Sequence, residues 1–423
     1  MLKILIIINL CFVSISMFGQ SALSIKDSAR INELKARLEI LSKGLKNKAP
    51  ELIRQTFADD ISISTGMSAG ANNFLEAILQ NVNFDSVEFP FDAFDLLEND
   101  PDTALVKVEF ILPTNRRQKS LVAFDRENKI LFVDYFDRLF GHSRYAKSSL
   151  VAIVPFRQED RSIILTVKLN NNPRQLSFLL DTGADGMAIR KSLADSLGIK
   201  AGKEQDANIV GGRTRVNISS GNVLHLTDSI ALTDQNMAIF DKIRHNLDGI
   251  IGLNLIKRYI TNINFDEQTI YLHSFGNYRY DKKSVTIPIM MKRSLIIVPS
   301  ELSITDMESV LGNFILDTGA NYNLIAFGDF VQRNRLLQTG FKPEAMGTTV
   351  SLGHSTTVYH GKAHELRIGE ISENNIPITL QTPLPDNSSA DKNMDGSIGI
   401  LFWSKYNLTI DLLKKEVNLA ARD

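Results

Sequence analysis

Two short runs in this 423-residue chain end in the same residues, Asp-Thr-Gly-Ala, and each follows an apolar stretch. Residues 178–184 read Phe-Leu-Leu-Asp-Thr-Gly-Ala, and residues 314–320 read Phe-Ile-Leu-Asp-Thr-Gly-Ala. Two carboxylates that share one proton can together activate a water molecule and polarise a carbonyl group. Amide hydrolysis needs this chemistry when it uses neither a metal nor a nucleophilic side chain. Asp181 and Asp317 are therefore the candidate catalytic pair.

The residues around each aspartate predict how its carboxylate is presented. The apolar run before it is typical of a buried β-strand, and the glycine after it allows a tight turn. The backbone amides of Gly183 and Gly319 can then donate hydrogen bonds to the carboxylate oxygens beside them. A single Asp-Thr-Gly is more often a turn or a helix cap, so this interpretation depends on the repetition.

A second pair of matching runs shows that the repetition extends beyond these motifs. Residues 248–252 read Asp-Gly-Ile-Ile-Gly and residues 395–399 read Asp-Gly-Ser-Ile-Gly, and the match continues downstream without a gap. The second copy is longer between its two motifs, and the mostly polar stretch 383–393 accounts for most of the excess as a loop. Whole lobes are therefore duplicated. Gly252 and Gly399 are expected to pack behind the strands that carry the aspartates, in a structural role.

These lobes, each with an apolar strand leading into Asp-Thr-Gly and an apolar-Gly step downstream, resemble the aspartic proteases. The chain is similar to bacterial secreted aspartyl proteases in which two retropepsin-like lobes are fused. The resemblance implies a mainly β, pepsin-like or retropepsin-like fold, with lobes at residues 150–278 and 283–423. It implies an exported aspartic endopeptidase that cleaves a peptide or protein substrate and uses no cofactor. The alternative is a catalytically silent protease fold that binds peptides.

The resemblance also suggests roles for the residues beside the aspartates. Thr182 and Thr318 would hydrogen-bond across the lobe interface and support the catalytic pair. Ala184 and Ala320 are the retroviral-type residues at a position where pepsins carry a hydroxyl group. Because a hydroxyl that donates to an ionised carboxylate lowers the carboxyl pKa, its absence should raise the pKa values of the pair. A pH optimum in weak rather than strong acid is therefore expected.

Closure over a substrate needs a flap, and the first lobe has a candidate between its two motifs. Residues 210–213 read Val-Gly-Gly-Arg, which makes Gly211 and Gly212 the flap candidates. The corresponding stretch of the second lobe is Ser-Leu-Gly-His at residues 351–354.

Three further features have both a catalytic and a structural interpretation. Asp248 and Asp395 each precede a glycine, and an Asp-Gly step favours a tight turn over a further catalytic acid. Residues 396–399, Gly-Ser-Ile-Gly, lack the Gly-x-Ser-x-Gly pattern of a nucleophile elbow. The structural interpretation is preferred in each case.

A histidine cluster in the second lobe raises the question of a metal site. It comprises His354, His360 and His364. On a strand, His360 and His364 would share one face, whereas the nearest carboxylate, Glu365, would point to the other face. No metal site is therefore predicted.

The region before the lobes, residues 21–145, has a different pattern. Apolar residues recur at helical spacing over residues 28–45, and Pro50 suits the first turn of a second helix that includes Phe57. A third short helix is expected around residues 74–79. These helices precede strands, which indicates an α+β domain.

The strands of this domain are predicted from alternation with a period of two. Apolar residues alternate with polar ones along 104–112, and residues 125–128 lie between two apolar runs, as in a hairpin. The element order resembles the cystatin-like cone of nuclear-transport-factor-two-like domains. Residues 135–150 are expected to form a linker. The domain can also be an inhibitory or targeting pro-region of the lobes that follow.

Composition limits the classes of partner. The chain is 43% hydrophobic and 22% charged, which is ordinary for a globular protein. It has 47 basic and 48 acidic residues, and this balance argues against binding to nucleic acid. A single chain that supplies both lobes is expected to act as a monomer with an internal pseudo-dimer.

The first twenty residues, 1–20, are typical of a secretory signal peptide. Lys3 is followed by an apolar run over residues 4–13 and a polar exit near Gln20. An uncleaved anchor is the alternative. Cys11, the only cysteine, lies in this segment, so the mature chain would have no disulfide or thiolate site. No other stretch is long and apolar enough to span a bilayer, so no membrane span is expected in the mature chain. The expected location is the periplasm or the extracellular space.

Overall fold

The computed structural model describes residues 23–24, 28–89, 94–97, 100–209, 212–244, 246–351, 354–383 and 394–422. These residues form two compact units. The smaller comprises the described residues up to Ile61 together with those of Leu79–Tyr135, and the larger comprises Ser62–Ile78 and the described residues from Phe136 onward.

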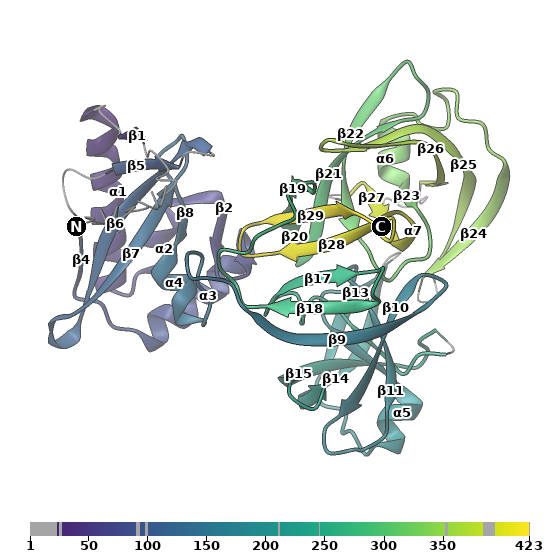
Figure 1. Ribbon diagram of the computed structural model, residues 1–423, viewed down its shortest axis with the longest axis horizontal. Coiled ribbons are helices and arrows are strands. Elements are labelled where there is room, and N and C mark those ends of the chain that lie inside the picture. The colour runs from purple at the N-terminus through teal and green to yellow at the C-terminus, as the bar shows by residue number, and fades with distance from the viewer. Residues whose placement is uncertain are drawn as a thin grey trace, which may run out of the picture. The chain divides into compact units, whose positions relative to one another are not determined.

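The smaller unit consists of helices and an antiparallel sheet. Its helices are α1 (Ser28–Lys46) and α2 (Pro50–Arg54). Its strands are β1 (Leu23–Ser24), β2 (Phe57–Ile63), β4 (Ser86–Glu88), β5 (Phe94–Leu97), β6 (Asp100–Leu112), β7 (Arg116–Phe124) and β8 (Ile130–Val133). The strand order is β1-β5-β6-β7-β8-β2, and β4 pairs with β6 on the side (Figure 1). An α+β arrangement is thus present, as predicted.

Local sequence explains the main elements of this unit. Helix α1 buries the stripe of leucines expected from the helical spacing: Leu34, Leu38, Leu41 and Leu45. Strands β7 and β8 form the predicted hairpin, because the Asp125 carboxylate accepts hydrogen bonds of 2.8 Å from the amides of Glu127 and Lys129 in the turn.

Two predictions for the region before the lobes are wrong. Phe57 does not extend the second helix but begins β2, since the Thr56 hydroxyl and amide both donate to the Ile53 carbonyl and end the helix there. Strands β2 and β3 (Gly66–Met67) therefore precede the third helix, α3 (Ala69–Asn81). The predicted linker starts with helical residues, because α4 spans Asp134–Leu139.

The larger unit is mainly β and contains two lobes. The first lobe consists of β9 (Leu150–Glu159), β10 (Ser162–Leu169), β11 (Leu176–Leu180), β12 (Met187–Arg190), α5 (Lys191–Ser196), β13 (Glu204–Ile209), β14 (Gly212–His225), β15 (Ala231–Phe240), β16 (Gly249–Ile251), β17 (Ile260–Asn264) and β18 (Thr269–His273). The second lobe consists of β19 (Val285–Pro288), β20 (Met290–Lys292), β21 (Leu295–Ser303), β22 (Ser309–Leu316), β23 (Leu324–Ala326), α6 (Gly328–Arg333), β24 (Ala345–Ser351), β25 (His354–Ile368), β26 (Ile371–Gln381), β27 (Gly396–Ile398), α7 (Ile400–Trp403), β28 (Tyr406–Asp411) and β29 (Glu416–Ala421).

The same three-strand arrangement occurs once in each lobe. In the first lobe β11 pairs in parallel with β16, and β16 pairs antiparallel with β12. Strands β22, β27 and β23 repeat these pairings in the second lobe. The registers also correspond, because Leu180 lies opposite Ile251 and Leu316 lies opposite Ile398. Equivalent strands therefore deliver the two aspartates that follow Leu180 and Leu316.

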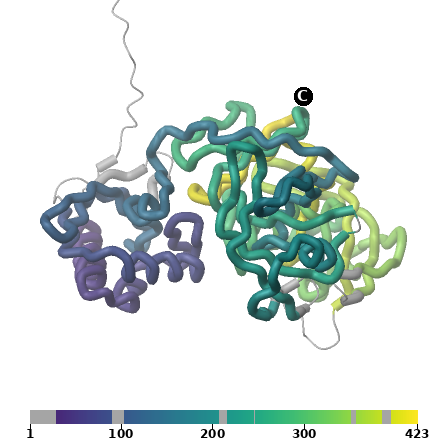
Figure 2. The backbone as a smooth tube through the Cα atoms, turned by 90° about the horizontal axis from the view of Figure 1, so that it is seen from below, coloured from purple at the N-terminus to yellow at the C-terminus, as the bar shows by residue number. Residues whose placement is uncertain are grey.

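The two lobes are joined by a continuous sheet, which runs β9-β18-β17-β28-β29-β19 (Figure 1). Strands β17 and β28 form the junction, where Asn262 lies opposite Thr409 and donates a 2.7 Å hydrogen bond to its hydroxyl. The teal first lobe and the green to yellow second lobe lie against each other in the tube view as well (Figure 2). Backbone hydrogen bonds thus hold the lobes in register.

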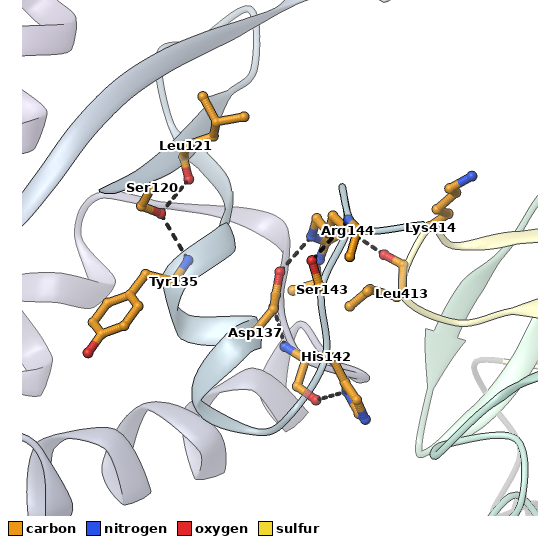
Figure 3. Close-up of polar contacts among 12 residues, drawn as sticks. Ser120, Leu121, Tyr135, Asp137, His142, Ser143, Arg144, Leu413 and Lys414 are labelled. Carbon is orange, nitrogen blue, oxygen red and sulfur yellow. Dashed lines mark hydrogen bonds and ion pairs between the residues drawn. The ribbon is translucent and has the colours of Figure 1, made fainter. Parts of the chain in front are cut away.

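A buried ion pair anchors the segment that leads into the first lobe (Figure 3). Arg144 Nε lies 2.6 Å from Asp137 Oδ2, and the Asp137 side chain is fully buried. The Arg144 guanidinium also donates to the Leu413 carbonyl, in the turn between β28 and β29, and to the Ser62 hydroxyl at 2.9 Å. The other Asp137 oxygen accepts the Ser64 amide at 2.5 Å. These bonds tie residues 62–64 and 137–144 to the second lobe within the larger unit.

Among the described residues, no helix is both long enough and apolar enough to cross a bilayer.

Candidate active site

The fold brings Asp181 and Asp317 together. Each aspartate amide donates to the carbonyl of the paired strand, Asp181 to Ile251 at 2.9 Å and Asp317 to Ile398 at 3.0 Å. The turns after the two strands face each other so closely that each glycine packs on the opposite carboxylate. A Cβ on Gly183 would lie 2.6 Å from Asp317 Cγ, and a Cβ on Gly319 would lie 2.2 Å from Asp181 Cγ. Only glycine leaves room for this approach.

The glycine amides hold one oxygen of each carboxylate. Gly183 N donates to Asp181 Oδ1 at 2.9 Å, and Gly319 N donates to Asp317 Oδ1 at 3.0 Å. These equivalent bonds orient both carboxylates and favour their ionised forms.

Thr182 and Thr318 cross-link the two lobes directly behind the carboxylates. The Thr182 amide donates to the Thr318 hydroxyl at 3.1 Å, and the Thr318 amide donates to the Thr182 hydroxyl at 3.0 Å. Each hydroxyl then donates to a backbone carbonyl of the other lobe, Thr182 to Leu316 at 2.6 Å and Thr318 to Leu180 at 2.9 Å. Both threonines are fully buried. This symmetric network fixes the separation of the two turns.

Gly252 and Gly399 lie immediately behind the two turns. A Cβ on Gly252 would lie 2.4 Å from the Ala184 carbonyl oxygen, and a Cβ on Gly399 would lie 2.6 Å from that of Ala320. The amides that follow these glycines bond to the same carbonyls, at 3.0 Å in the first lobe and 2.9 Å in the second. Backbone thus packs on backbone here, which leaves no room for a side chain.

Both carboxyl pKa values are raised, and the cause is mainly burial. For Asp181 burial is the largest effect, and the charge of Asp317 raises the pKa further. For Asp317 burial also raises the pKa, but hydrogen bonds from Ser397, from the Gly319 amide and from Asp181 oppose it. Each aspartate keeps part of its surface accessible, although protein atoms surround it on most sides. The hydrogen bonds that Asp317 accepts therefore offset part of the rise in its pKa.

Two residues at the site were not recognised from the sequence as site residues. The Ser397 hydroxyl donates to Asp317 Oδ2 at 3.1 Å, and the Tyr322 phenol lies within hydrogen-bonding reach of Ser397 and Asp317. An alignment of the two copies could have indicated these two residues, because each hydroxyl-bearing residue stands opposite one without a hydroxyl. Ser397 stands where the first copy has Ile250, and Tyr322 stands where it has Gly186.

Gly212, one of the two flap candidates, lies at the end of a hairpin. Strands β13 and β14 pair from Glu204 opposite Asn217 to Ile209 opposite Gly212, so Gly212 begins the second strand of the hairpin. Gly211 lies outside the described residues. The second lobe has a matching hairpin, β24 with β25, in which Ser351 pairs with His354. Closure by either hairpin stays a prediction.

Asp248 and Asp395 have the structural role predicted for them. Asp248 accepts the Ser177 amide at 2.9 Å, and Asp395 accepts the Asn313 amide at 2.8 Å. Each carboxylate thus holds a backbone amide of the strand that leads to Asp181 or to Asp317. Asp395 also forms a 2.6 Å ion pair with Arg333.

The histidines of the second lobe do not converge with carboxylates. His360 Nδ1 lies 3.1 Å from the Thr379 hydroxyl. Within the ranges that the structure describes, no three His, Cys, Asp or Glu side chains are grouped as metal ligands.

Known proteins similar to this chain include an aspartyl protease family and a solved aspartic proteinase. Residues 165–255, which contain both motifs of the first lobe, match the family model described as aspartyl protease. The solved structure of the aspartic proteinase from Irpex lacteus is similar with 13% identity and a TM-score of 0.44, over 66% of this chain and 98% of that one. No curated protein matches the chain significantly. The larger unit has an aspartic protease-like fold, since the second lobe repeats the strand pairings of the matched first lobe.

Proposed function

We propose that this chain is an exported aspartic endopeptidase, which hydrolyses peptide bonds in peptide or protein substrates with Asp181 and Asp317 as its catalytic pair. The observation that supports this proposal most directly is the packing of Gly183 on the Asp317 carboxylate and of Gly319 on the Asp181 carboxylate. Two carboxylates so close together share a proton, because both cannot ionise easily at about 3 Å separation.

The chemistry follows from this shared proton. The ionised carboxylate takes a proton from a water molecule while the water oxygen forms a bond to the carbonyl carbon of the substrate. The protonated carboxyl donates its proton to the carbonyl oxygen, which produces a tetrahedral intermediate. Proton transfer to the amide nitrogen then allows the carbon–nitrogen bond to break. The buried threonines keep the two carboxylates in place throughout.

Cleavage of a denatured protein mixture, with and without pepstatin, tests the proposal. Asp181→Asn and Asp317→Asn should each abolish pepstatin-sensitive cleavage. Asp228→Asn is the matched control, since its side chain is fully exposed in the turn between β14 and β15. Wild-type activity in either dyad variant would rule out the paired-carboxylate mechanism. Tight peptide or pepstatin binding without cleavage by the wild type would instead support the silent, peptide-binding alternative.

Export and a monomeric state are part of the same proposal. The signal-peptide pattern of residues 1–20 supports export to the periplasm or beyond, and the pairing of β17 with β28 supports an active site completed within one chain. Amino-terminal sequencing of the protein from cell fractions should find a mature end near Gln20 outside the cytoplasm. Light scattering should give the mass of one chain in an active sample. A cytoplasmic full-length protein would contradict export, and an obligate dimer would contradict the monomeric state.

A further inference from the structure

The two carboxylates have equivalent turn glycines, but their other neighbours differ. Each carboxylate accepts the amide of its own turn glycine, at 2.9 Å for Asp181 and 3.0 Å for Asp317. Among the described residues, a side-chain hydroxyl of Ser, Thr or Tyr lies beside Asp317 but not beside Asp181: Ser397 Oγ donates to Asp317 Oδ2 at 3.1 Å. Ser397 belongs to β27, directly beside the strand that carries Asp317, and is only 1% exposed.

Tyr322 extends this hydroxyl contact. It lies in the turn after β22, and its phenol is within hydrogen-bonding reach of Ser397 and Asp317. The phenol is also close enough to Asp181 for the charge of that carboxylate to raise the pKa of Tyr322. Its ring packs against a small apolar cluster beneath the turn, which comprises Ile297, Ile315, Ile325, Phe327 and Met394. A Cβ on Gly399 would lie 2.8 Å from Tyr322 Cδ2, so a glycine there gives the ring its space.

The first lobe has no counterpart of this pair of hydroxyls. Its equivalent positions are Ile250, which packs beside Ile164, Leu179 and Leu247, and Gly186. The asymmetry is therefore built into the duplicated fold by two substitutions, and it places both hydroxyls next to the same carboxylate.

A hydroxyl group that points at a carboxylate stabilises the ionised form, because it donates its hydrogen to the negative charge. The titratable side chains that face Asp317 are Asp181, from the turn of the first lobe, and Tyr322, from its own turn. Burial raises the pKa of Tyr322 well above its usual value, so the phenol stays protonated and keeps its hydrogen available to donate.

We propose that Ser397 and Tyr322 are positioning residues that make the dyad asymmetric, with their hydroxyls holding Asp317 as the ionised carboxylate and leaving the shared proton on Asp181. The catalytic part of this inference rests on the proposed function, whereas the placement of the proton does not. Asp317 then takes the proton of the attacking water, and Asp181 gives its proton to the substrate carbonyl oxygen. When the intermediate collapses, Asp317 passes its proton to the leaving nitrogen, and a hydroxyl of the intermediate returns a proton to Asp181.

The kinetic test is the pH profile of kcat/KM. Ser397→Ala and Tyr322→Phe each remove one hydroxyl, so the acid limb of the profile should move to higher pH, by about one unit for Ser397→Ala. Ser397→Thr keeps the hydroxyl, so the acid limb of its kcat/KM profile should lie at the same pH as in the wild type. Ser300→Ala is the matched control, because Ser300 is 3% exposed and donates to the Val298 carbonyl at 3.2 Å, away from the dyad. An unmoved acid limb in both hydroxyl-deleted variants would overturn the proposal.

A second test needs no activity. Protein labelled with ¹³C at the aspartate carboxyl carbons is titrated by NMR, and the two signals are assigned by their loss in Asp181→Asn and Asp317→Asn. The Asp317 carboxyl should ionise at lower pH than Asp181, and Ser397→Ala should narrow this gap. If Asp317 ionises at lower pH than Asp181 in a protein that cleaves no substrate, the proposed function is wrong but the proposed proton placement is correct. Simultaneous titration, or first ionisation of Asp181, would refute the placement even in an active enzyme.

Discussion

Thr182 and Thr318 each reach into the other lobe and donate a hydroxyl hydrogen to the strand that carries the opposite aspartate. The Thr182 bond to the Leu316 carbonyl is 2.6 Å long, and the Thr318 bond to the Leu180 carbonyl is 2.9 Å long. Each hydroxyl also accepts the amide of the other threonine. The amides and hydroxyls of both threonines are therefore buried and paired across the lobe interface.

The first prediction concerns this network. Thr182→Val or Thr318→Val should lower the free energy of unfolding by about 1–3 kcal/mol, because each leaves a buried amide and a buried carbonyl without a partner. Urea denaturation measures the loss. Thr→Ser at the same position keeps the hydroxyl and serves as the control. If the valine and serine variants were equally stable, the hydroxyl bonds would not be the source of the stability.

The second prediction concerns the close approach of the two turns. Gly183→Ala and Gly319→Ala should lower kcat/KM at least about 100-fold, because the new methyl group must displace a carboxylate. Gly186→Ala is a control in the first of these turns, since a Cβ there would have no atom within 4 Å. Comparable losses in all three variants would mean that the effect arises from general disturbance of the turn.

The third prediction concerns the buried ion pair between Asp137 and Arg144. Arg144→Met should destabilise the larger unit by about 3–5 kcal/mol, because the buried Asp137 charge loses its Arg144 partner. Asp137→Leu combined with Arg144→Met should recover part of this loss. The control is Arg157→Met, which breaks a half-exposed pair with Glu159 and should cost less than about 1 kcal/mol. Similar losses in Arg144→Met and Arg157→Met, measured by urea denaturation, would contradict the prediction.

The fourth prediction concerns pH and stability. Burial and the nearby charge of Arg144 lower the pKa of His142 to about 4, from an unfolded value near 6.5. The unfolded chain therefore takes up this proton first as the pH falls, so stability is full above about pH 6.5 and declines towards pH 4. The urea midpoint should fall over this range in the wild type and fall less in His142→Gln.

His364→Gln, at an exposed position, provides the control for this pH dependence. Its profile should follow that of the wild type. Parallel profiles for the wild type and His142→Gln would show that other groups cause the acid loss.

The fifth prediction concerns the pH of activity. Burial raises the pKa values of both dyad carboxyls, and Ala184 and Ala320 supply no hydroxyl to lower them again. The optimum should lie in weak acid, and Ala320→Ser should move the acid limb to lower pH by adding a donor beside Asp317. An optimum below about pH 3 in the wild type would count against this reasoning.

Local patterns in the sequence are enough to predict several features. An apolar run, an aspartate and a glycine turn are adjacent in the chain, so the two strands and their turns follow from the order of the residues alone. The duplication of the lobes is visible because the matching runs recur without a gap. The buried leucine stripe of α1 likewise follows from helical spacing.

Only the tertiary structure decided which of these features meet. Asp181 and Asp317 converge because β17 pairs with β28 and because the threonines bond across the interface, and these contacts join residues far apart in the chain. Ser397 lies in a run that lacks the pattern of a nucleophile elbow, yet its strand pairing places its hydroxyl on Asp317. Sequence periodicity reports which face of a strand is buried, whereas the neighbour on that face depends on long-range strand pairing. That is why the aspartates could be named from the sequence, and the hydroxyls that distinguish them could not.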